Sequence, residues 1–553
     1  MLNRHIIVAS ILAMGTTASI AAEPLFFQNT TMMKDGITAV SPFATDKKVV
    51  RSSAGLRLNP AATNATELNL NLPDGRQLKA TRVNRYTTSS GSTVWIGKHL
   101  QANSSTLAAD MAASSAGEET ILVEREGRIM GSMRSGGKLY RIRSAADGSH
   151  AVAEIDVSRF PPDHKENEYQ SVVGQSKAQH AHGKALGSAP SEVAQFDQQA
   201  RATSTANAVA LATPSVIRVL VNYTSSAKTA AGDIDALIDL SMAETNQGYV
   251  NSNINARVEL AHKAAVTYTQ SGTQSTDRDR YAATSDGYMD EIHTQRNTYA
   301  ADVGMLIVND GDESCGIAKA IGATTTSAFA VVHWDCSTGN LSFGHELGHL
   351  FGARHNPEND GTTTPYAYGH GYWAPNAAWR TIMAYPCSAK TCPRLNYWSS
   401  PLITYTDSQK MGTTANSDNA RVLNERAAVL AAFRGAVPTA VTGTNTADYT
   451  IPDNNTSGAS SPISISTAGN AGTVTVDVNI VHTYSGDLVV DLIAPDNTVY
   501  TLQSRVGGSA DNIVKSFTVN VGAKSRVGTW KLRVSDRSAS DTGYINGWTF
   551  KSL

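Results

Sequence analysis

The segment His-Glu-Leu-Gly-His-Leu-Phe-Gly-Ala-Arg-His at residues 345–355 constrains the fold of this chain more than any other feature. Histidines four positions apart lie one turn above each other on a helix, so His345 and His349 can bind one metal ion. Gly352 can adopt a positive φ, which ends the helix and turns the chain back so that His355 reaches the same ion. Three imidazoles that leave a fourth position open are typical of catalytic zinc.

Glu346 follows the first histidine and points about 100° around the helix from it. In that direction its carboxylate can contact a water molecule on the zinc ion instead of the metal, as a general base requires. Zinc lowers the pKa of such a water to about 7 and polarises the carbonyl that it attacks, and Glu346 returns the proton to the leaving amine. The motif therefore predicts a zinc cofactor and hydrolysis of peptide bonds in protein or peptide substrates.

The sequence around the motif alternates between strand and helix patterns, which predicts an α/β domain with a mixed, mainly parallel sheet. Compact apolar runs predict strands at residues 216–223, 256–268, 303–308 and 329–334. Apolar residues at helical spacing predict helices at residues 233–247, 285–300 and 418–433. Ser417 or Asp418 is a suitable N-cap for the last helix. This catalytic domain is expected to extend over residues 214–435.

A second segment, Thr-Ile-Met-Ala-Tyr at residues 381–385, follows the histidine motif. The two segments together resemble the metzincins, in which a methionine turn lies beneath the metal. The resemblance implies that Met383 forms the floor of the zinc site. It also implies that Tyr385 either packs there or hydrogen-bonds near the oxyanion.

The segment Cys-Gly-Ile-Ala at residues 315–318, before a strand that ends near Cys336, is similar to the reprolysin or adamalysin branch of the metzincins. In that branch the strand before the zinc helix lies at the edge of the sheet and pairs with extended substrate, which here implies residues 327–333. Many reprolysins have aspartate after the third histidine, where this chain has Asn356. Because that position is not a ligand, the resemblance still implies activity.

Three further segments combine aromatic, arginine and cysteine residues: residues 365–372, 379–387 and 392–398. They resemble the bacterial peptidyl-Asp metalloendopeptidases, a family associated with cleavage before acidic residues. A pocket for a substrate carboxylate favours a bidentate guanidinium. Arg394 is the first candidate for that group, with Arg380 and Lys390 after it. The alternative for each of the three is an ordinary surface charge.

Residues 1–22 have the pattern of an export signal, with Arg4 before an apolar run and cleavage expected after Ala21 or Ala22. The protein is therefore predicted to be secreted. A membrane anchor is the alternative, but the apolar run is too short to cross a bilayer of about 30 Å, so no stable membrane insertion is expected. The balance of 46 basic and 48 acidic residues argues against a nucleic-acid partner.

The four cysteines are expected to form disulfides, because exported proteins meet oxidising conditions. Cys387 and Cys392 enclose a short loop that can close on itself, which leaves Cys315 to pair with Cys336. A site of four thiolates around zinc is the alternative, but the sequence has no CxxC spacing.

The chain before the catalytic domain is predicted to be a propeptide. Residues 23–164 contain short strand-like alternations, which indicate a β-rich unit. Residues 165–213 are rich in Ala, Ser, Gln and Thr, so we interpret them as an exposed linker that contains the maturation site.

This propeptide is expected to act as an inhibitor or as a chaperone of the catalytic domain. It contains no cysteine, so a thiolate cannot be the group that blocks the zinc. If it acts through the metal, the candidates near its end are Asp156, Asp163 and His164. We favour the alternative, in which these three are surface polar residues of a β-rich chaperoning unit.

The C-terminal part, after a linker at residues 436–446, is predicted to be an all-β sandwich over residues 447–553. The sequences at residues 482–496, 528–536 and 541–548 resemble the P domain of proprotein convertases. Four of its aspartates are either calcium ligands or turn-forming residues: Asp487, Asp491, Asp496 and Asp536.

Two other functions are compatible with these patterns. The first is a catalytically idle protein in which zinc braces the fold and the sandwich binds a surface. Glu346 and the open fourth metal position argue against it. The second is a zinc hydrolase that acts on amides other than peptides.

Overall fold

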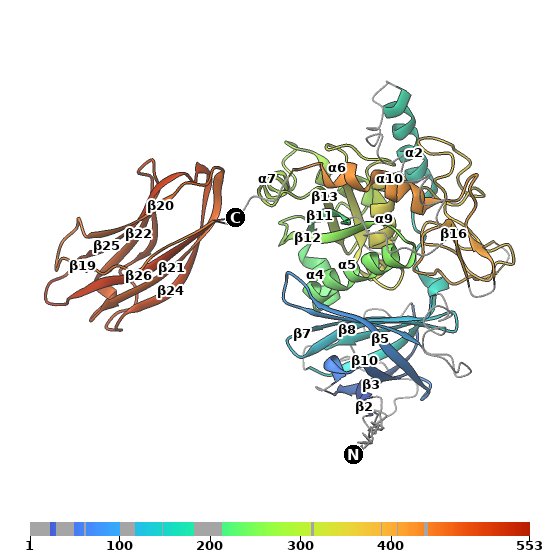
Figure 1. Ribbon diagram of the computed structural model, residues 1–553, viewed down its shortest axis with the longest axis horizontal. Coiled ribbons are helices and arrows are strands. Elements are labelled where there is room, and N and C mark those ends of the chain that lie inside the picture. The colour runs from blue at the N-terminus through green and yellow to red at the C-terminus, as the bar shows by residue number, and fades with distance from the viewer. Residues whose placement is uncertain are drawn as a thin grey trace, which may run out of the picture.

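The computed structural model describes residues 23–28, 49–59, 62–99, 117–145, 148–181, 213–310, 314–388, 390–405, 408–435 and 441–552 (Figure 1). The predicted export signal and most of the predicted maturation linker, at residues 182–212, lie outside these stretches. Figure 1 shows a central α/β unit, with an N-terminal β unit against it and a C-terminal β unit at the far end of the chain.

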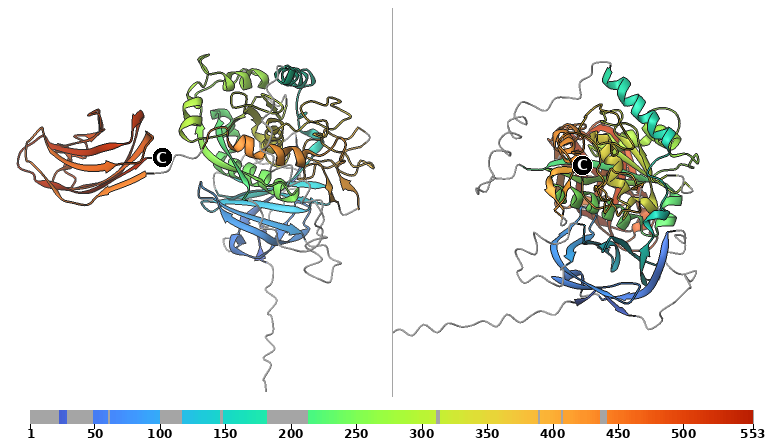
Figure 2. Two further views of the ribbon diagram at one scale, coloured as in Figure 1. Left: turned by 45° about the horizontal axis from the view of Figure 1, so that its top comes forward. Right: turned by 90° about the vertical axis from the view of Figure 1, so that its right-hand side faces the viewer.

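The N-terminal unit is a curved β-sheet (Figure 2). Over the part of the chain that the structure describes, this sheet has ten strands in the order β1 (Glu23–Pro24), β4 (Glu67–Asn71), β5 (Gln77–Thr87), β6 (Thr93–His99), β7 (Glu119–Arg125), β8 (Arg128–Ser135), β9 (Lys138–Ser144), β10 (His150–Ile155), β3 (Val50–Leu58) and β2 (Phe26–Gln28). The strand patterns predicted at residues 77–83, 120–126, 139–143 and 151–157 correspond to β5, β7, β9 and β10. Short 3₁₀ turns lie at Ala62–Asn64 and Val157–Arg159.

The central sheet has the order β12 (Ala256–Ala265), β11 (Ser215–Tyr223), β13 (Val303–Val308), β15 (Phe329–His333) and β14 (Gly316–Ala318) among the described residues. The first four strands are parallel and β14 is antiparallel to β15. The prediction that residues 327–333 form the edge is therefore wrong, because β14 covers that side. A strand of three residues is too short to leave a periodic pattern in the sequence.

Helices cover both faces of the central sheet. The core on one face contains side chains of α5 (Ile234–Asn251), α9 (Ser342–Phe351) and α10 (Asn419–Ala431). The core on the other face contains side chains of α6 (Gln274–Ala282) and α7 (Glu291–Thr298). Shorter elements complete the unit: α4 (Ser225–Ala231), α8 (Trp334–Ser337), β16 (Ser400–Thr404) and β17 (Lys410–Met411).

Two of the predicted helices match well and one is shorter than expected. Asp418 caps α10 as predicted, since its carboxylate accepts a hydrogen bond from the Arg421 N–H at 3.2 Å. The helix predicted from residue 285 begins only at Glu291. Gly287 and Met289 have φ values of 84° and 56°, which interrupt a right-handed helix.

The segment predicted to begin an exposed linker instead begins with a helix, α2 (Glu166–Ala181). Its residues Tyr169, Val172 and Val173 are buried in the core that also contains α6 and α7. Three apolar side chains in this position are enough to dock one helical turn, although the composition around them is polar.

The C-terminal unit is a sandwich of two antiparallel sheets in its described residues. One sheet contains β18 (Val441–Asn445), β26 (Gly543–Ser552), β21 (Asn470–His482) and β24 (Ile513–Ser525), with β19 (Tyr449–Ile451) paired to β26. The other contains β20 (Ala459–Ile465), β25 (Gly528–Asp536), β22 (Leu488–Ile493) and β23 (Val499–Ser504). A 3₁₀ turn at Ser485–Asp487 precedes β22.

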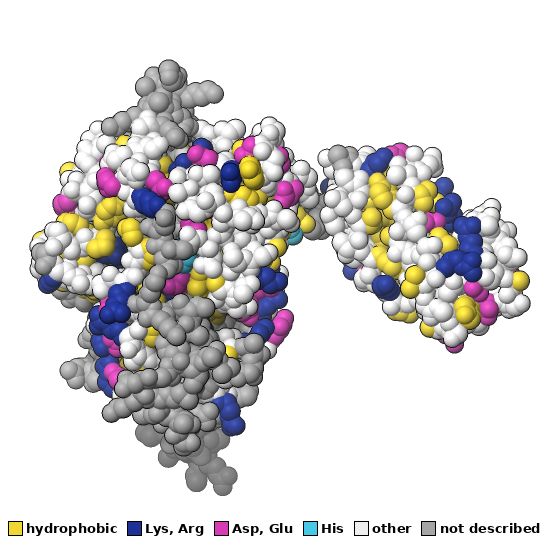
Figure 3. Space-filling model, turned by 180° about the vertical axis from the view of Figure 1, so that it is seen from behind, with side chains coloured by type: hydrophobic (Ala, Val, Ile, Leu, Met, Phe, Trp, Pro, Cys, Tyr) yellow, Lys and Arg dark blue, Asp and Glu magenta, His cyan; other side chains and the backbone are white. Residues whose placement is uncertain are grey.

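Both predicted disulfides are confirmed, between Cys315 and Cys336 and between Cys387 and Cys392. The first joins the residue before β14 to helix α8 after β15. Among the described helices, none combines the length and the apolar character needed to cross a bilayer. On the face shown in Figure 3, basic and acidic side chains are interspersed over the central unit, and several basic side chains lie together on the sandwich.

Candidate active site

Helix α9 carries the first part of the histidine motif, and it ends where the sequence predicted. Gly352 follows the helix with φ 121°, and its N–H donates to the carbonyls of Gly348 and His349 at 3.1 and 2.9 Å. Every residue of α9 is buried. The turn at Gly352 brings His355 back towards the two histidines of the helix.

Three imidazoles of the motif converge through their Nε2 atoms. His345 and His349 each lie 3.2 Å, Nε2 to Nε2, from His355. The Nδ1–H of His345 donates to the carbonyl of Ile382 at 3.0 Å, and that of His349 to the carbonyl of Ala353 at 2.9 Å. These bonds place the proton of each ring on Nδ1, so both Nε2 atoms direct a lone pair into the centre. Lone pairs directed at one point suit a cation bound between the rings.

A fourth imidazole, from His164 of the N-terminal part of the chain, joins this cluster. Its Nε2 lies 3.1 Å from that of His349 and 3.3 Å from that of His345. Tetrahedral coordination with Zn–N bonds of about 2.0–2.1 Å places neighbouring ligand nitrogens about 3.3 Å apart. Four of the nitrogen pairs in the cluster have this spacing, and all four ligand atoms lie within 4.8 Å of one another, so the rings have the donor type and the proximity that a zinc site needs. Within the described residues, no other group of three or more His, Cys, Asp or Glu side chains converges in this way.

Burial keeps these imidazoles neutral, which is the form that binds a metal. It lowers the pKa of His345 to about 3 and that of His164 to about 4. The pKa values of His349 and His355 also lie well below the usual range, and burial is again the largest cause.

Glu346 lies beside the cluster with its side chain fully buried. Neither of its carboxylate oxygens has a hydrogen-bond partner among the described residues. Burial, followed by the charge of Asp163, raises the pKa of Glu346 well above its usual value. A nearby divalent cation and a water molecule would supply the interactions that this buried carboxylate lacks. Gly316 leaves room for it, since a Cβ on that glycine would lie 2.7 Å from Glu346 Oε1.

The segment with Met383 lies against helix α9. A Cβ added to Gly348 would lie 2.9 Å from the Met383 sulfur and 2.6 Å from the ring of Trp398. A glycine is therefore needed within the histidine motif itself. Sequence analysis singled out neither Gly348 nor Trp398, because a close approach of this kind depends on a segment distant in the chain.

Tyr385 packs against the third histidine, with its ring centroid 4.0 Å from that of His355. Its hydroxyl makes no hydrogen bond with the described residues. The backbone N–H of Tyr385 donates to Asn356 Oδ1 at 3.0 Å. Asn356 therefore supports the turn that carries Tyr385, a role that an aspartate oxygen at that position would also fill.

Comparisons with known proteins match this geometry. A family model described as "Metallo-peptidase family M12" matches residues 213–399 of this chain. A second family model, described as "Proprotein convertase P-domain", matches residues 471–552. A peptidyl-Asp metalloendopeptidase of Stenotrophomonas maltophilia (strain K279a) is 40% identical over 433 residues, which are 77% of this chain and 97% of the relative. One of Xanthomonas campestris pv. campestris is 40% identical over 395 residues, 71% of this chain and 87% of the relative.

The chain belongs to the peptidyl-Asp metalloendopeptidase family. Both resemblances stated from the sequence, to this family and to the P domain, are confirmed. The protein is thus a metalloendopeptidase, and its family implies a metal at the histidine cluster.

The prediction that the three polar candidates near the end of the propeptide lie on its surface was wrong, because all three are buried. In this metalloendopeptidase Asp163 and His164 are buried, with 5% and 4% of their surfaces exposed, and do not lie on the surface. Asp156 is 8% exposed and lies away from the histidines, where it caps a 3₁₀ turn and pairs with Arg51 at 3.1 Å. The short segment that ends at His164 has no helix or strand pattern, so the sequence contained no signal for its position.

Asp163 lies between the two arginines that were candidates for an acid pocket. A guanidinium nitrogen of Arg394 donates to Asp163 Oδ2, and Arg380 lies 3.9 Å from the same oxygen. Arg394 and Arg380 are 5% and 6% exposed, so neither is an ordinary surface charge. Burial by itself would raise the pKa of Asp163, but Arg394, His345 and Arg380 together hold it below its usual range. Lys390 is exposed and forms no part of this group.

Backbone contacts place the same segment along the edge of the central sheet. The N–H of Cys315 donates to the carbonyl of Pro162 at 2.9 Å, and that of Gly316 to the carbonyl of Asp163 at 3.2 Å. These donors belong to β14 and the residue before it. Strand β14 is therefore the edge of the sheet on this side, and an extended segment of the propeptide pairs with it.

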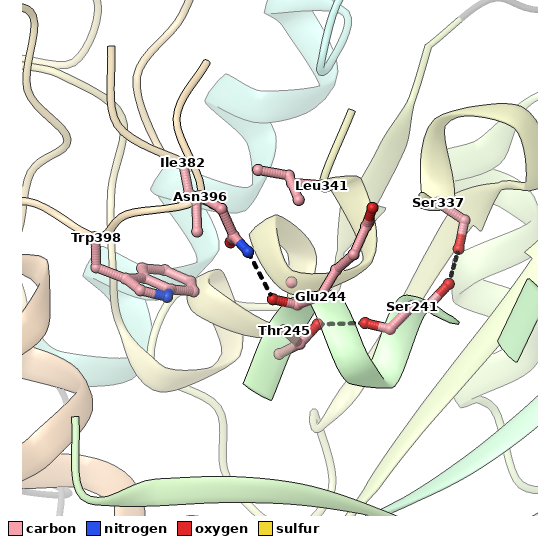
Figure 4. Close-up of a pocket in the computed structure, with 9 residues that line it drawn as sticks. Ser241, Glu244, Thr245, Ser337, Leu341, Ile382, Asn396 and Trp398 are labelled. Atoms are coloured by element: carbon pink, nitrogen blue, oxygen red, sulfur yellow. Dashed lines mark hydrogen bonds between the residues drawn. The ribbon is translucent and has the colours of Figure 1, made fainter. Parts of the chain in front are cut away.

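A small cavity lies between α5 and α9, and none of the four histidines is among the residues that line it (Figure 4). Its wall includes Glu244, whose backbone carbonyl accepts a hydrogen bond from Asn396 at 3.0 Å. The Glu244 carboxylate accepts from Ser132 at 2.5 Å and from the Gly339 N–H at 2.9 Å. Because Ser132 belongs to β8, the Glu244 carboxylate connects the wall of this cavity to the N-terminal unit.

Proposed function

We propose that the mature protein is a secreted zinc endopeptidase of the metzincin type that cleaves peptide bonds on the N-terminal side of aspartate. One observation carries the specificity: a buried aspartate, Asp163, is held by two buried arginines beside the histidine cluster. A substrate carboxylate at the same place would meet the same two guanidinium groups.

In this proposal His345, His349 and His355 hold the zinc ion. Zinc, when bound, lowers the pKa of a water molecule to about 7 and polarises the carbonyl of the scissile bond. The carbonyls of Ile382 and Ala353 orient two of the ligand rings through their Nδ1–H groups, which keeps Nε2 available.

Glu346 acts as the general base. Its buried carboxylate has no competing hydrogen bond among the described residues, so it is free to accept a proton from the attacking water and to pass it to the leaving amine. Tyr385 supplies a hydroxyl beside His355 that can donate to the developing oxyanion. Strand β14 pairs with the substrate backbone, which aligns the peptide without reading its sequence.

Arg394 and Arg380 form the acid pocket, and they select the residue after the scissile bond. A planar guanidinium binds a carboxylate through two parallel hydrogen bonds, and low exposure strengthens the attraction. Arg394 is held in position by donating to the carbonyl of Asn340 at 2.9 Å. A neutral side chain in the pocket would leave both guanidinium groups without an anionic partner, which disfavours other residues.

Export and processing belong to the same proposal. Residues 1–22 act as a cleaved signal, and a cut within residues 165–213 separates residues 23–164 from the catalytic domain at residues 214–435. The pattern of the first 22 residues and the two disulfides support an oxidising destination outside the cytoplasm.

The specificity is tested on the mature protein with a digest of a mixed proteome. We expect Asp to be enriched directly after the cut. In Arg394→Gln, kcat/KM for an Asp peptide should fall by about 30-fold or more, because a buried ion pair loses one partner. Arg421→Gln, on the surface of α10, is the matched control. Equal enrichment of Asp in Arg394→Gln would contradict the assignment of the pocket.

The mechanism is tested with Glu346→Gln. Activity should fall by about 10²–10⁴-fold, while one metal ion per chain is retained. Unchanged activity would reject Glu346 as the base. Casein digestion with and without a chelator separates the remaining alternatives, since an idle zinc-braced protein or a hydrolase of other amides would leave casein intact in both samples.

A further inference from the structure

We propose that residues 161–164 keep the precursor inactive by occupying its active site, with His164 as the fourth zinc ligand and Asp163 in the acid pocket. This inference rests on the proposed function, and it assigns the regulation of the same site. The propeptide thereby acts as an inhibitor through the metal and the specificity pocket at once.

His164 has the geometry of a ligand. Its Nδ1–H donates to the carbonyl of Gly316 at 2.7 Å, which leaves the lone pair on Nε2, the atom that faces the other histidines. Its side chain is 1% exposed, so the ring has exchanged contact with water for contact with the cluster. Catalytic zinc keeps its fourth position for water or substrate, and His164 fills that position.

Tyr169 of α2 holds the imidazole of His164 in place. The two rings are stacked, with centroids 5.5 Å apart and an angle of 7° between their planes. The Tyr169 hydroxyl donates to Asp360 at 2.5 Å, and Asp360 is paired with Arg354 at 3.0 Å. Tyr169 therefore links the segment to a buried ion pair of the catalytic domain.

Asp163 adds a second attachment one residue before the ligand. Its carboxylate contacts Arg394 and Arg380, the pair to which we assign substrate recognition. The backbone around it pairs with Cys315 and Gly316 next to β14. The segment thus uses the metal position, the acid pocket and the substrate-binding edge together, and no substrate can bind until it leaves.

Release requires more than a cut in the linker. The contacts of Asp163, His164 and Tyr169 all precede residue 182, where the undescribed part of the linker begins. A cut after that residue leaves these contacts in place. Activation therefore requires the cleaved propeptide to dissociate or to be degraded.

The metal contact is tested in the full-length precursor carrying Glu346→Gln, which prevents self-processing. His164→Gln should weaken zinc binding by at least about tenfold in competition with a chelator, because loss of even a residue that supports a ligand costs that much. It should also change the visible spectrum of the cobalt(II)-substituted precursor. His99→Gln is the matched control, since His99 is a buried propeptide histidine bonded to Thr120 at 2.7 Å. Equal zinc affinity and equal spectra for His164→Gln and its parent would overturn the proposal.

A second measurement keeps His164 unchanged, so it tests the proposal even if His164→Gln fails to fold. A hydroxamate should shift the cobalt(II) spectrum of the mature enzyme and leave that of the intact precursor unchanged. A shift in the precursor would show an open metal position and overturn the proposal. If neither form binds a metal, the proposed function itself fails. If the precursor and the mature enzyme bind the metal equally tightly, only this inference fails.

The pocket contact is tested by latency in the precursor with Glu346 intact. Asp163→Asn should raise the rate of self-processing by about 30-fold, because it removes one partner of a buried ion pair. Asp156→Asn is the matched control, since Asp156 pairs with Arg51 inside the propeptide. Equal rates for the two variants would contradict the role of Asp163.

Discussion

The two β units of this chain differ in how they are joined to the catalytic unit. The N-terminal unit shares a hydrophobic core with it: Ile96, Ile121 and Met130 lie in the same buried cluster as Leu237 and Leu347. The core of the C-terminal sandwich consists, among the described residues, only of side chains from residues 451–550. One β unit is therefore part of the precursor's fold, and the other has a core of its own.

Buried charges add to this difference. Arg141 and Arg143 of β9 contact Asp335 of α8 at 2.6 and 2.8 Å, and both arginine side chains are almost fully buried. Arg134 of β8 donates to the carbonyl of Gly339. Such an interface separates into two faces that water can solvate, because the charged groups regain hydration. We interpret it as a contact built to be released, like the contact at His164.

Deletion of each β unit in turn should give the largest difference between the two units. Without residues 23–164 the yield of soluble, active enzyme should fall by at least about tenfold, because each Val, Ile or Met side chain of the shared core contributes about 1.5–3 kcal/mol. Without residues 441–553 the yield should change little. The measurement is proteolytic activity per amount of soluble protein, and equal losses in the two deletions would contradict the comparison.

The next test removes the charge of Asp335. In Asp335→Asn the free energy of unfolding of the precursor should fall by about 3 kcal/mol, since two buried arginines lose their anionic partner. The mature enzyme lacks both arginines and should be nearly unaffected. Asp279→Asn is the control, because Asp279 pairs with Lys319 within the catalytic unit. Denaturant melts of both forms measure the effect, and equal losses in precursor and mature enzyme would break the comparison.

Low pH should weaken the contact between Asp335 and the two arginines of β9. Burial opposes ionisation of Asp335, but Arg141 and Arg143 outweigh it and lower its pKa to about 2. A lowered pKa gives stability that is complete above the unfolded pKa, about 3.9, and is lost as pH falls through the folded value. The propeptide, once cut, should stay bound at pH 5 and dissociate increasingly as pH falls from about 4 towards 2. Gel filtration measures this, and Asp335→Asn should show a smaller dependence on pH.

The smallest expected effect concerns calcium and the sandwich. All four candidate aspartates already contact cationic or ionisable partners: Asp487 with Arg505 at 3.8 Å, Asp491 with Arg533 at 2.8 Å, Asp496 with Lys524 at 2.5 Å and Asp536 with His482 at 3.2 Å. We therefore expect calcium to leave the melting temperature of residues 441–553 unchanged relative to EGTA. A clear rise with calcium would reveal a site in this unit and restore the calcium interpretation.

Much of the catalytic unit could be predicted from local sequence. The apolar run at β13 and the amphipathic pattern of α10 with Asp418 before it were predicted to within a few residues. The edge strand β14 and helix α6 were not predicted. The first has three residues, and the second, Gln-Ser-Thr-Asp-Arg-Asp-Arg-Tyr-Ala, is too polar to show an apolar face.

The sequence by itself determined the three imidazoles, Glu346 and the turn at Gly352, because one helix and one glycine set their relative positions within eleven consecutive residues. Only the tertiary structure decided that His164, 181 positions before His345, joins them and that Asp163 meets Arg394. Local patterns report which way a side chain points along its own helix or strand. Which distant segment lies against it depends on how whole units pack, and no periodicity in the sequence records that.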